Sequence, residues 1–350
     1  MEKSTRNAII IGSFIFMGMM TVAIGESDDS TDGSKNGTDS TAYNNMEQVF
    51  NEERRSLSQS ENSLNKELDK IMVSEPIQGD PYKELDELVG LESVKKEVTS
   101  LANFVRIQKQ RKEKGLKTSQ ISYHCVFTGN PGTGKTTVAR ILARIYKDLG
   151  IVKRGHLVET DRSGLIAEYV GQTATKTNAV VDSALNGILF IDEAYALLDK
   201  KGGGYGDEAI ATLLKRMEDD RDRLVVIVAG YNNEMKEFID ANPGLQSRFT
   251  RYINFPDYSS NDLYAIFMSR VNKYSYKLDK DADKYLKKSL EETVAHKSRN
   301  FGNGRYVRNL FEQTITNQAH RLGTRKNLTT EELSQITLSD ISGACKTVVK

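Results

Sequence analysis

The sequence predicts an α/β domain with a parallel sheet flanked by helices, followed by a small all-helical domain. Two observations support this: apolar runs alternate with amphipathic helices, and the strand signal vanishes after Pro256. Such alternation is typical of a doubly wound domain, whose strands are buried on both faces and are therefore continuously apolar. We place the α/β domain at 80–256 and the helical domain at 257–350. The expected strands are 121–127, 186–191 and 224–229, with weaker ones at 156–160 and 252–255.

The composition is that of an ordinary globular protein. Its 350 residues suffice for one large and one smaller domain, and 38% of them are hydrophobic. Lys and Arg number 49 against 48 Asp and Glu, so no overall positive field attracts nucleic acid, and no nucleic-acid partner is expected. The 2 cysteines, Cys125 and Cys345, cannot form a disulfide framework or a zinc site and indicate a reducing compartment.

The N-terminus differs from the rest of the chain. Residues 1–7 form a basic tail, and residues 8–25 contain no charged side chain. This apolar stretch reaches the lower limit for a membrane-spanning helix, about 17 residues. We expect a membrane anchor at 8–25. The alternatives are a cleaved signal segment, because small residues end the stretch, and an apolar segment of a cytosolic protein.

Residues 26–79 are expected to connect this N-terminal stretch to the α/β domain. The part at 26–45 is rich in Ser, Asp and Gly and cannot bury a core, which is typical of a linker. The part at 46–73 has a helical pattern, and either a short amphipathic or coiled-coil segment or a plain solvated helix accounts for it. Its apolar residues with a spacing of seven are Phe50, Leu57, Leu64 and Ile71.

The motif "GNPGTGKTT" at 129–137 is the strongest chemical signal in the chain. It follows an expected strand and opens an amphipathic helix, which is the setting of a phosphate-binding loop. Backbone N–H groups of such a loop surround phosphate oxygens, while Lys135 would reach the β- and γ-phosphates and Thr136 would hold Mg²⁺. The expected nucleotide-binding residues are Asn130, Pro131, Gly132, Thr133, Gly134, Lys135, Thr136 and Thr137.

Two carboxylates end the expected strand "ILFI" at 188–191. Asp192 can bind Mg²⁺, and Glu193 can orient and deprotonate an attacking water molecule. A carboxylate pair at a strand end is unspecific alone, since it could cap the next helix. Together with the phosphate-binding loop it predicts nucleotide hydrolysis with ATP and Mg²⁺.

The order of these motifs resembles that of the AAA+ ATPases, and several stretches resemble the CbxX/CfqX group in particular. This group includes the red-type Rubisco activases and the stage V sporulation protein K. The resemblance covers roughly residues 80–345. The stretches that carry it are "LVGLESVKKEV" (88–98), "YVGQTATKT" (169–177), "YGDEAIATLLKRMEDDRDRLVVIVAGY" (205–231), "NPGLQSRF" (242–249), "INFPDYS" (253–259) and "GNGRYVRN" (302–309).

The resemblance implies roles for residues outside the two motifs. Val89 and Gly90 match the segment that contacts the adenine. Arg248 matches the arginine finger, which in this family reaches the nucleotide of the neighbouring subunit and would act with Glu193 and Lys135 in catalysis. Arg305 matches the sensor arginine of the helical lid, with Arg308 one turn along as the alternative.

Two further assignments follow from the resemblance. Tyr231 stands where the family has a polar sensor residue, commonly asparagine, and Asn232 follows it, so either side chain could contact the γ-phosphate. Tyr169, Val170 and Gly171 resemble a pore loop that grips an extended polypeptide. The alternative is that Tyr169 packs under its own domain as a core residue.

The expected function is Mg²⁺-dependent ATP hydrolysis by an oligomeric ring, a homo-hexamer, that remodels a protein client. Two alternatives stay open: a nucleic-acid-linked loader or initiator, and a membrane-tethered scaffold that binds ATP without turnover. The nucleotide motifs place the ATPase domain in the cytoplasm, tethered by residues 8–25. The positive-inside rule applied to the basic tail favours the opposite topology.

Overall fold

The computed structural model describes residues 71–118, 122–167, 171–198 and 204–348, which all belong to one compact unit formed by residues 59–350. The predictions for residues 1–7 and 8–25, and for nearly all of 26–79, lie outside the described residues. Within the four described ranges, no helix combines the length and the hydropathy of a membrane span.

A six-stranded sheet forms the centre of the first domain, in the order β1-β3-β4-β5-β2-β6. Every pair of neighbours is parallel except β1 and β3, which confirms the predicted α/β fold. The strand expected at 121–127 begins only at residue 125. The strands are β1 (Met72–Ser74), β2 (Cys125–Thr128), β3 (Leu157–Thr160), β4 (Gly187–Ile191), β5 (Leu224–Gly230) and β6 (Arg251–Asn254).

Strand β1 lies within residues 26–79, and its first two residues belong to the stretch 46–73 whose pattern predicted a helix, so that prediction is wrong for Met72 and Val73. It pairs antiparallel with β3, so that Met72 lies opposite Glu159 and Ser74 opposite Leu157. The strand has only 3 residues, and its apolar side chains are exposed, 62% for Met72 and 42% for Val73. A strand this short without a buried face gives no periodic signal, so the sequence pattern could not reveal it.

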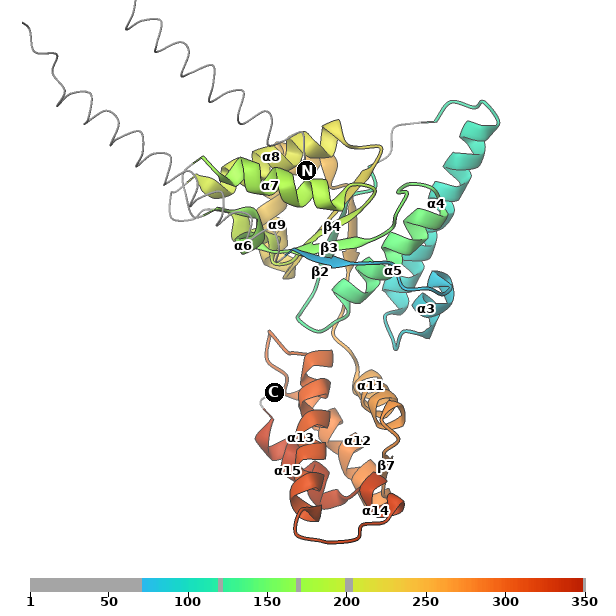
Figure 1. Ribbon diagram of the computed structural model, residues 1–350, viewed down its shortest axis with the longest axis vertical. Helices are drawn as coiled ribbons and strands as arrows, with labels where there is room; N and C mark the ends of the chain where they lie inside the picture. The colour runs from blue at the N-terminus through green and yellow to red at the C-terminus, as the bar shows by residue number, and fades with distance from the viewer. Residues whose placement is uncertain (1–70, 119–121, 168–170, 199–203, 349–350) are drawn as a thin grey trace, which may run out of the picture. The chain divides into compact units, whose positions relative to one another are not determined.

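Helices cover both faces of the sheet (Figure 1). Successive strand residues point to opposite faces. Phe127 accordingly packs with α4 and α5, whereas its neighbour Val126 packs with α7, α8 and α9. The helices of this domain are α3 (Pro81–Glu87), α4 (Glu92–Glu113), α5 (Lys135–Asp148), α6 (Arg162–Leu165), α7 (Thr173–Ala184), the 3₁₀-helix η1 (Ala194–Leu197), α8 (Tyr205–Asp219), α9 (Asn232–Asp240) and α10 (Pro243–Arg248).

The second domain is helical, as predicted, with one difference. Although no strand was expected after Pro256, two strands of 2 residues each pair in parallel here. Each is too short to leave a pattern in the sequence. The elements are α11 (Ser260–Lys273), β7 (Lys277–Leu278), α12 (Lys280–Ala295), α13 (Gly304–Leu322), α14 (Thr330–Ser334), β8 (Gln335–Ile336) and α15 (Leu338–Thr347).

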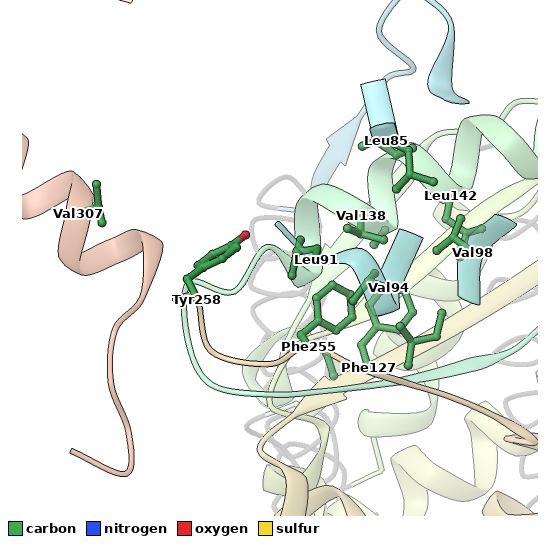
Figure 2. Packing of buried hydrophobic residues seen from close by; sticks show 14 of the residues in the cluster. Leu85, Leu91, Val94, Val98, Phe127, Val138, Leu142, Phe255, Tyr258 and Val307 are labelled. Carbon is green, nitrogen blue, oxygen red and sulfur yellow. The ribbon is translucent and has the colours of Figure 1, made fainter. Parts of the chain in front are cut away.

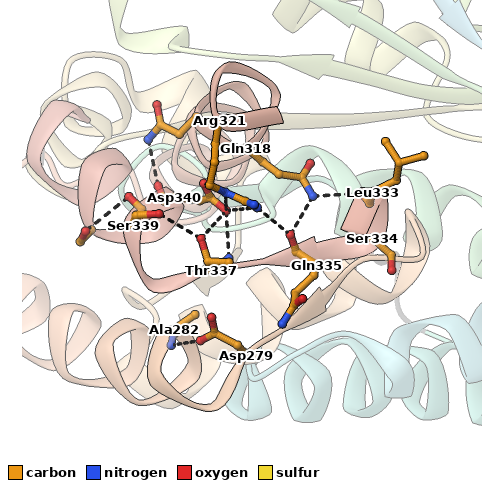
Figure 3. Close-up of polar contacts among 12 residues, drawn as sticks. Asp279, Ala282, Gln318, Arg321, Leu333, Ser334, Gln335, Thr337, Ser339 and Asp340 are labelled. Carbon is orange, nitrogen blue, oxygen red and sulfur yellow. Dashed lines mark hydrogen bonds and ion pairs between the residues drawn. The ribbon is translucent and has the colours of Figure 1, made fainter. Parts of the chain in front are cut away.

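A buried carboxylate fixes the C-terminal part of this domain. Asp340 is 1% exposed; it accepts hydrogen bonds from the Arg321 guanidinium and from the backbone N–H and hydroxyl of Thr337 (Figure 3). Although burial alone would raise the pKa of Asp340, these bonds lower it. Gln318 donates to the carbonyl groups of Leu333 and Gln335, so α13 holds the start of β8.

A short connector, residues 255–259, joins the two domains. Its Phe255 packs on Phe127 with 5.0 Å between ring centroids. Figure 2 shows the ring of Tyr258 extending from the connector towards Leu91. Ser259 then caps α11 by a reciprocal pair of hydrogen bonds with Asp262, which explains why the helix begins there.

Candidate functional site

The phosphate-binding loop lies at the carboxyl end of β2 and leads into α5. The φ angles of Gly129, Gly132 and Gly134 are 143°, 72° and 96°, values that residues other than glycine rarely adopt. At Gly129 there is also no space, because a Cβ atom would lie 2.2 Å from the Phe255 carbonyl oxygen. The glycine pattern is therefore a requirement of this backbone.

Lys135 is the first residue of α5, and its side chain folds over the loop. Its Nζ donates to the carbonyl oxygens of Gly129 and Asn130, at 2.8 and 2.9 Å. Burial lowers the pKa of Lys135, and the negative charge of Asp192 opposes this effect. The described partners of this cation are carbonyl oxygens, from which it can be redirected to an anionic ligand.

The two carboxylates follow β4 as expected, and the second has an unusual backbone. Glu193 has φ 48° and ψ 41°, in the left-handed region, and its N–H donates to Asp192 Oδ1 at 3.1 Å. A non-glycine residue in this region costs about 1–2 kcal/mol. The conformation keeps the Glu193 side chain exposed at the end of the strand, where it can meet a water molecule.

A cleft of about 370 Å³ brings the loop, the carboxylates and α13 together. This volume falls in the range of small-ligand sites. The predicted residues that line it are Pro131, Gly132, Gly134, Lys135, Thr136, Thr137, Asp192, Glu193, Tyr231 and Arg305. The predicted residues absent from its lining are Val89, Gly90, Asn130, Thr133, Asn232 and Arg248.

Three arginines of the helical domain line the cleft. Arg305 and Arg308 both do so, one turn apart on α13, and Arg270 of α11 joins them. Together with Lys135 these guanidinium groups suit a ligand with several negative charges, since planar guanidinium groups bind phosphate oxygens in pairs. Arg270 was not predicted from the sequence, because only the packing of α11 beside α13 places it there.

Tyr195 was also missed, and it lies beside Tyr231 near the second carboxylate. The two rings are 6.1 Å apart, and Gly230 leaves room for the Tyr195 ring, since a Cβ atom there would lie 2.7 Å from it. Burial, with the negative charge of Glu193 second, raises the pKa of Tyr195 to about 12 and also raises that of Tyr231. Both hydroxyl groups are therefore protonated, and the charge of Glu193 acts on both of them. Asn232 is the first residue of α9.

Arg248 lies at the end of α10 and contacts Glu218 of its own chain. The distance from Nη2 to Glu218 Oε2 is 3.5 Å, and Nη1 donates to the Gly244 carbonyl at 3.5 Å. Its Nε is buried and has no hydrogen-bond partner among the residues that the structure describes. The side chain thus has spare donors and does not line the cleft of its own chain.

The segment expected to contact adenine lies against the start of α11. Gly90 and Leu91 both have φ 60°, which makes a tight turn, and a Cβ atom at Gly90 would lie 2.9 Å from Asp262 Oδ1. The turn therefore meets the first helix of the helical domain.

Tyr169 and Val170 of the expected pore loop lie outside the described residues, and Gly171 has φ 78°. The segment before them is held by buried polar groups of α7. Lys176 donates to the carbonyl oxygens of Ser163 and Ile166, at 2.8 and 3.0 Å. The base of this loop is therefore fixed to the domain.

Comparisons with known proteins agree with this architecture. The profile of the ATPase family associated with various cellular activities (AAA) matches residues 125–257, and that of the AAA lid domain matches residues 259–349. The AAA domain of FIGL-1 in complex with ADP has the same fold, with a TM-score of 0.60 at 18% identity over 82% of this chain and 90% of that one.

Relatives in sequence are similar over the same region. Stage V sporulation protein K of Bacillus subtilis (strain 168) is 41% identical over 261 residues, which are 74% of this chain and 81% of the relative. The ESX-3 secretion system protein EccA3 of Mycolicibacterium smegmatis is 43% identical over 272 residues, 74% of this chain but only 45% of the relative. EccA3 of Mycobacterium tuberculosis (strain H37Rv) is 40% identical over 284 residues, and the chain spans 45% of its length. The chain therefore belongs to the AAA+ ATPases, with an AAA domain followed by an AAA lid domain, and the suspected relationship to the group of stage V sporulation protein K is confirmed.

Proposed function

We propose that this protein hydrolyses ATP with Mg²⁺ and works as an oligomeric ring, a homo-hexamer, to remodel a protein client. One observation carries the proposal: a single cleft combines the phosphate-binding loop, two carboxylates and three lid arginines. A polyphosphate ligand, an oxygen-ligated metal ion and a water molecule with its base all find suitable groups there.

The oxygen ligands of the cleft suit Mg²⁺. Thr136 and Asp192 both line it, and a hydroxyl with a carboxylate is a donor set that Mg²⁺ accepts alongside phosphate oxygens. Bound there, the ion would neutralise charge on the phosphates. Lys135 would bind the β- and γ-phosphates, and Glu193 would accept the proton of the attacking water molecule. The protonated hydroxyl groups of Tyr195 and Tyr231 would orient Glu193 or that water molecule.

The position of Arg248 supports a shared site between subunits. The residue lies outside the cleft of its own chain, and its contacts there are long, 3.5 Å to the Glu218 carboxylate and 3.5 Å to the Gly244 carbonyl. In a ring, the same guanidinium would reach the nucleotide of the neighbouring subunit and stabilise charge on the γ-phosphate.

The client would be a protein rather than a nucleic acid. The net charge of +1 gives no global attraction for nucleic acid. Two of the relatives are named for a secretion system and one for sporulation. Tyr169 and Val170 would contact the client, since an aromatic face packs on almost any side chain. Residues 8–25 would tether the ATPase domain to the cytoplasmic face of a membrane.

Turnover of ATP by the purified full-length chain tests the proposal. We expect phosphate release that requires Mg²⁺, depends on protein concentration because the site is shared, and is unchanged by DNA or RNA. Sedimentation with and without nucleotide would measure the oligomer. Stimulation by nucleic acid would favour a loader, and binding without release would favour a scaffold.

A further inference from the structure

The outward side of the phosphate-binding loop is bonded to the connector and the lid. Three consecutive carbonyl oxygens of the loop accept hydrogen bonds from these segments. The Pro131 oxygen accepts from Asn303 Nδ2 at 3.4 Å, and the Gly132 oxygen accepts from the N–H of residue 304 at 3.0 Å. The Thr133 carbonyl oxygen accepts from the Tyr258 hydroxyl at 3.3 Å. The conformation of the loop therefore depends on groups from the neighbouring segments.

Asp257 of the connector joins these segments through one carboxylate. Its Oδ1 accepts from Asn130 Nδ2 of the loop at 2.9 Å and from Asn303 Nδ2 of the lid at 2.8 Å. Its Oδ2 pairs with Lys297 Nζ of the lid at 2.8 Å. Although burial alone would raise the pKa of Asp257, the bonds from Lys297, Asn303 and Asn130 lower it. We call these four residues, Asn130, Asp257, Lys297 and Asn303, the lid latch.

The backbone of Asn303 indicates that its side chain is required. Its φ of 47° and ψ of −119° are those of the first central residue of a type II′ turn, a position that favours glycine. The N–H of Arg305 donates to the Gly302 carbonyl at 2.8 Å and closes the turn. Glycines flank the position on both sides, yet the strained position itself is asparagine. Its amide is fully buried and also accepts from the Tyr258 N–H at 2.9 Å.

The backbones of loop and lid are also in direct contact. A Cβ atom at Gly132 would lie 2.3 Å from the Gly302 carbonyl oxygen, and one at Gly304 would lie 2.8 Å from the Gly132 carbonyl oxygen. A displacement of the turn at 302–305 must therefore displace the loop or break its bonds.

We infer that Asp257 and Asn303 are positioning residues that couple the position of the lid to the shape of the phosphate-binding loop. The inference rests on the proposed ATP binding and adds the path by which the lid controls it. With the latch closed, the loop carbonyl groups are bonded outward and its N–H groups are preorganised to face the cleft. With the latch open, the loop loses this support and its affinity for phosphate falls.

The variant Asn303→Gly separates the latch from folding, because glycine removes the amide while relieving the backbone. We expect the dissociation constant for ADP carrying a fluorescent label to rise about tenfold, the equivalent of one hydrogen bond to a charged group. The melting temperature should fall by only a few degrees, because relief of the backbone offsets part of the lost hydrogen bonds. Asn327→Gly is the matched control, since Asn327 is an exposed asparagine with φ 59° in a lid loop. It should bind the label as the wild type does.

Hydrogen exchange of the nucleotide-free full-length chain gives a readout that does not need ATP binding. In Asn303→Gly, the peptide covering residues 129–137 should exchange faster than in the wild type and in Asn327→Gly. If Asn303→Gly left both the exchange of residues 129–137 and the affinity for the label unchanged, the proposed coupling through the lid latch would be wrong. If the wild type itself failed to bind the label, the proposed function would fail, while the exchange comparison would still decide on the latch.

A second variant acts from the opposite end. Asn130→Ala removes the loop's bond to Asp257, and we expect faster exchange in the lid turn at 302–305, far away in sequence. Because both asparagines bond to the same carboxylate oxygen, Asn130→Ala and Asn303→Gly should be non-additive in affinity. Asn130→Ala with Asn327→Gly should be additive. Additive effects of Asn130→Ala and Asn303→Gly, or an unchanged lid turn, would contradict the coupling even if Asn303→Gly folded poorly.

Discussion

Arg248 and Glu218 form an ion pair within one chain, with 3.5 Å between Nη2 and Oε2. Their side chains are 28% and 55% exposed, and pairs this exposed contribute about 0–1 kcal/mol. In the proposed ring, a phosphate bound by the neighbouring subunit could therefore compete for the guanidinium at little cost. The pair describes a resting position of Arg248, from which assembly of a ring would release it.

Arg248→Ala should leave nucleotide binding nearly intact and abolish hydrolysis, because in the proposed ring the guanidinium acts in the neighbouring site. Mixtures of Arg248→Ala with Glu193→Gln subunits should regain part of the turnover, since each variant supplies what the other lacks. Phosphate release across a series of mixing ratios measures this. Glu218→Gln is the control and should stay near wild-type turnover. If no mixture regains activity although the ring assembles, the arginine does not act in trans.

Glu193→Gln and Lys135→Ala should fail at different steps. Removal of the general base should lower kcat by about 10²-fold or more while labelled ATP still binds. Removal of the lysine should weaken binding itself, by about tenfold or more, because the charge at the phosphates is lost. Titration with labelled ATP alongside single-turnover hydrolysis separates the two effects. Wild-type turnover in both variants would rule out this cleft as the ATPase site.

His124 should make the fold sensitive to pH. It is 5% exposed and its Nδ1 accepts from the Val226 N–H at 2.9 Å, while burial, with the charge of Arg248 second, lowers its pKa from 6.5 to about 4. Between these two values the unfolded chain binds a proton that the folded chain does not. The contribution of neutral His124 to the free energy of unfolding is therefore fully present above about pH 6.5. The free energy of unfolding should fall by up to about 3 kcal/mol as the pH drops towards 4.

Urea unfolding at a series of pH values measures this slope. His124→Gln keeps an acceptor for the backbone without a titrating ring, so the slope between pH 6.5 and 4 should flatten. His296→Gln changes an exposed histidine and should retain the wild-type slope. Equal slopes in all three proteins would show that His124 does not control the acid sensitivity.

Tyr169→Ala and Lys176→Met should differ in their effect on stability. If Tyr169 belongs to a client-binding loop, its removal should change the free energy of unfolding by less than about 1 kcal/mol, whereas a core tyrosine would cost about 3 kcal/mol or more. Lys176→Met leaves two carbonyl groups without their donor and should cost about 1–3 kcal/mol. Urea unfolding measures both. A large loss in Tyr169→Ala would favour the core reading.

The parts of the site that lie close in sequence could be predicted from it. The phosphate-binding loop and the pair Asp192 and Glu193 are each recognised by the spacing of their own residues. The long apolar runs beside them predicted the central strands. These features are local, because each depends on a turn or a strand formed by the residues of the motif itself.

The rest depends on packing between distant segments. Arg270 lines the cleft only because α11 packs beside α13, and Tyr195 lies next to Tyr231 only because Gly230 leaves space for its ring. Asn303 lies within the motif at 302–309, but its backbone angles and its bonds to distant residues such as Asp257 are what indicate a role. Single-sequence patterns contain no information on such pairings.

The left-handed backbone of Glu193 affects which substitutions at this position increase the stability of the fold. Glycine at this position would avoid a penalty of about 1–2 kcal/mol, so the fold alone would be better served without the carboxylate. If Glu193 is the general base of the proposed reaction, selection for folding and selection for turnover act in opposite directions at this residue. A library screened only for heat resistance should enrich inactive substitutions at 193, and keeping the glutamate requires screening for turnover as well.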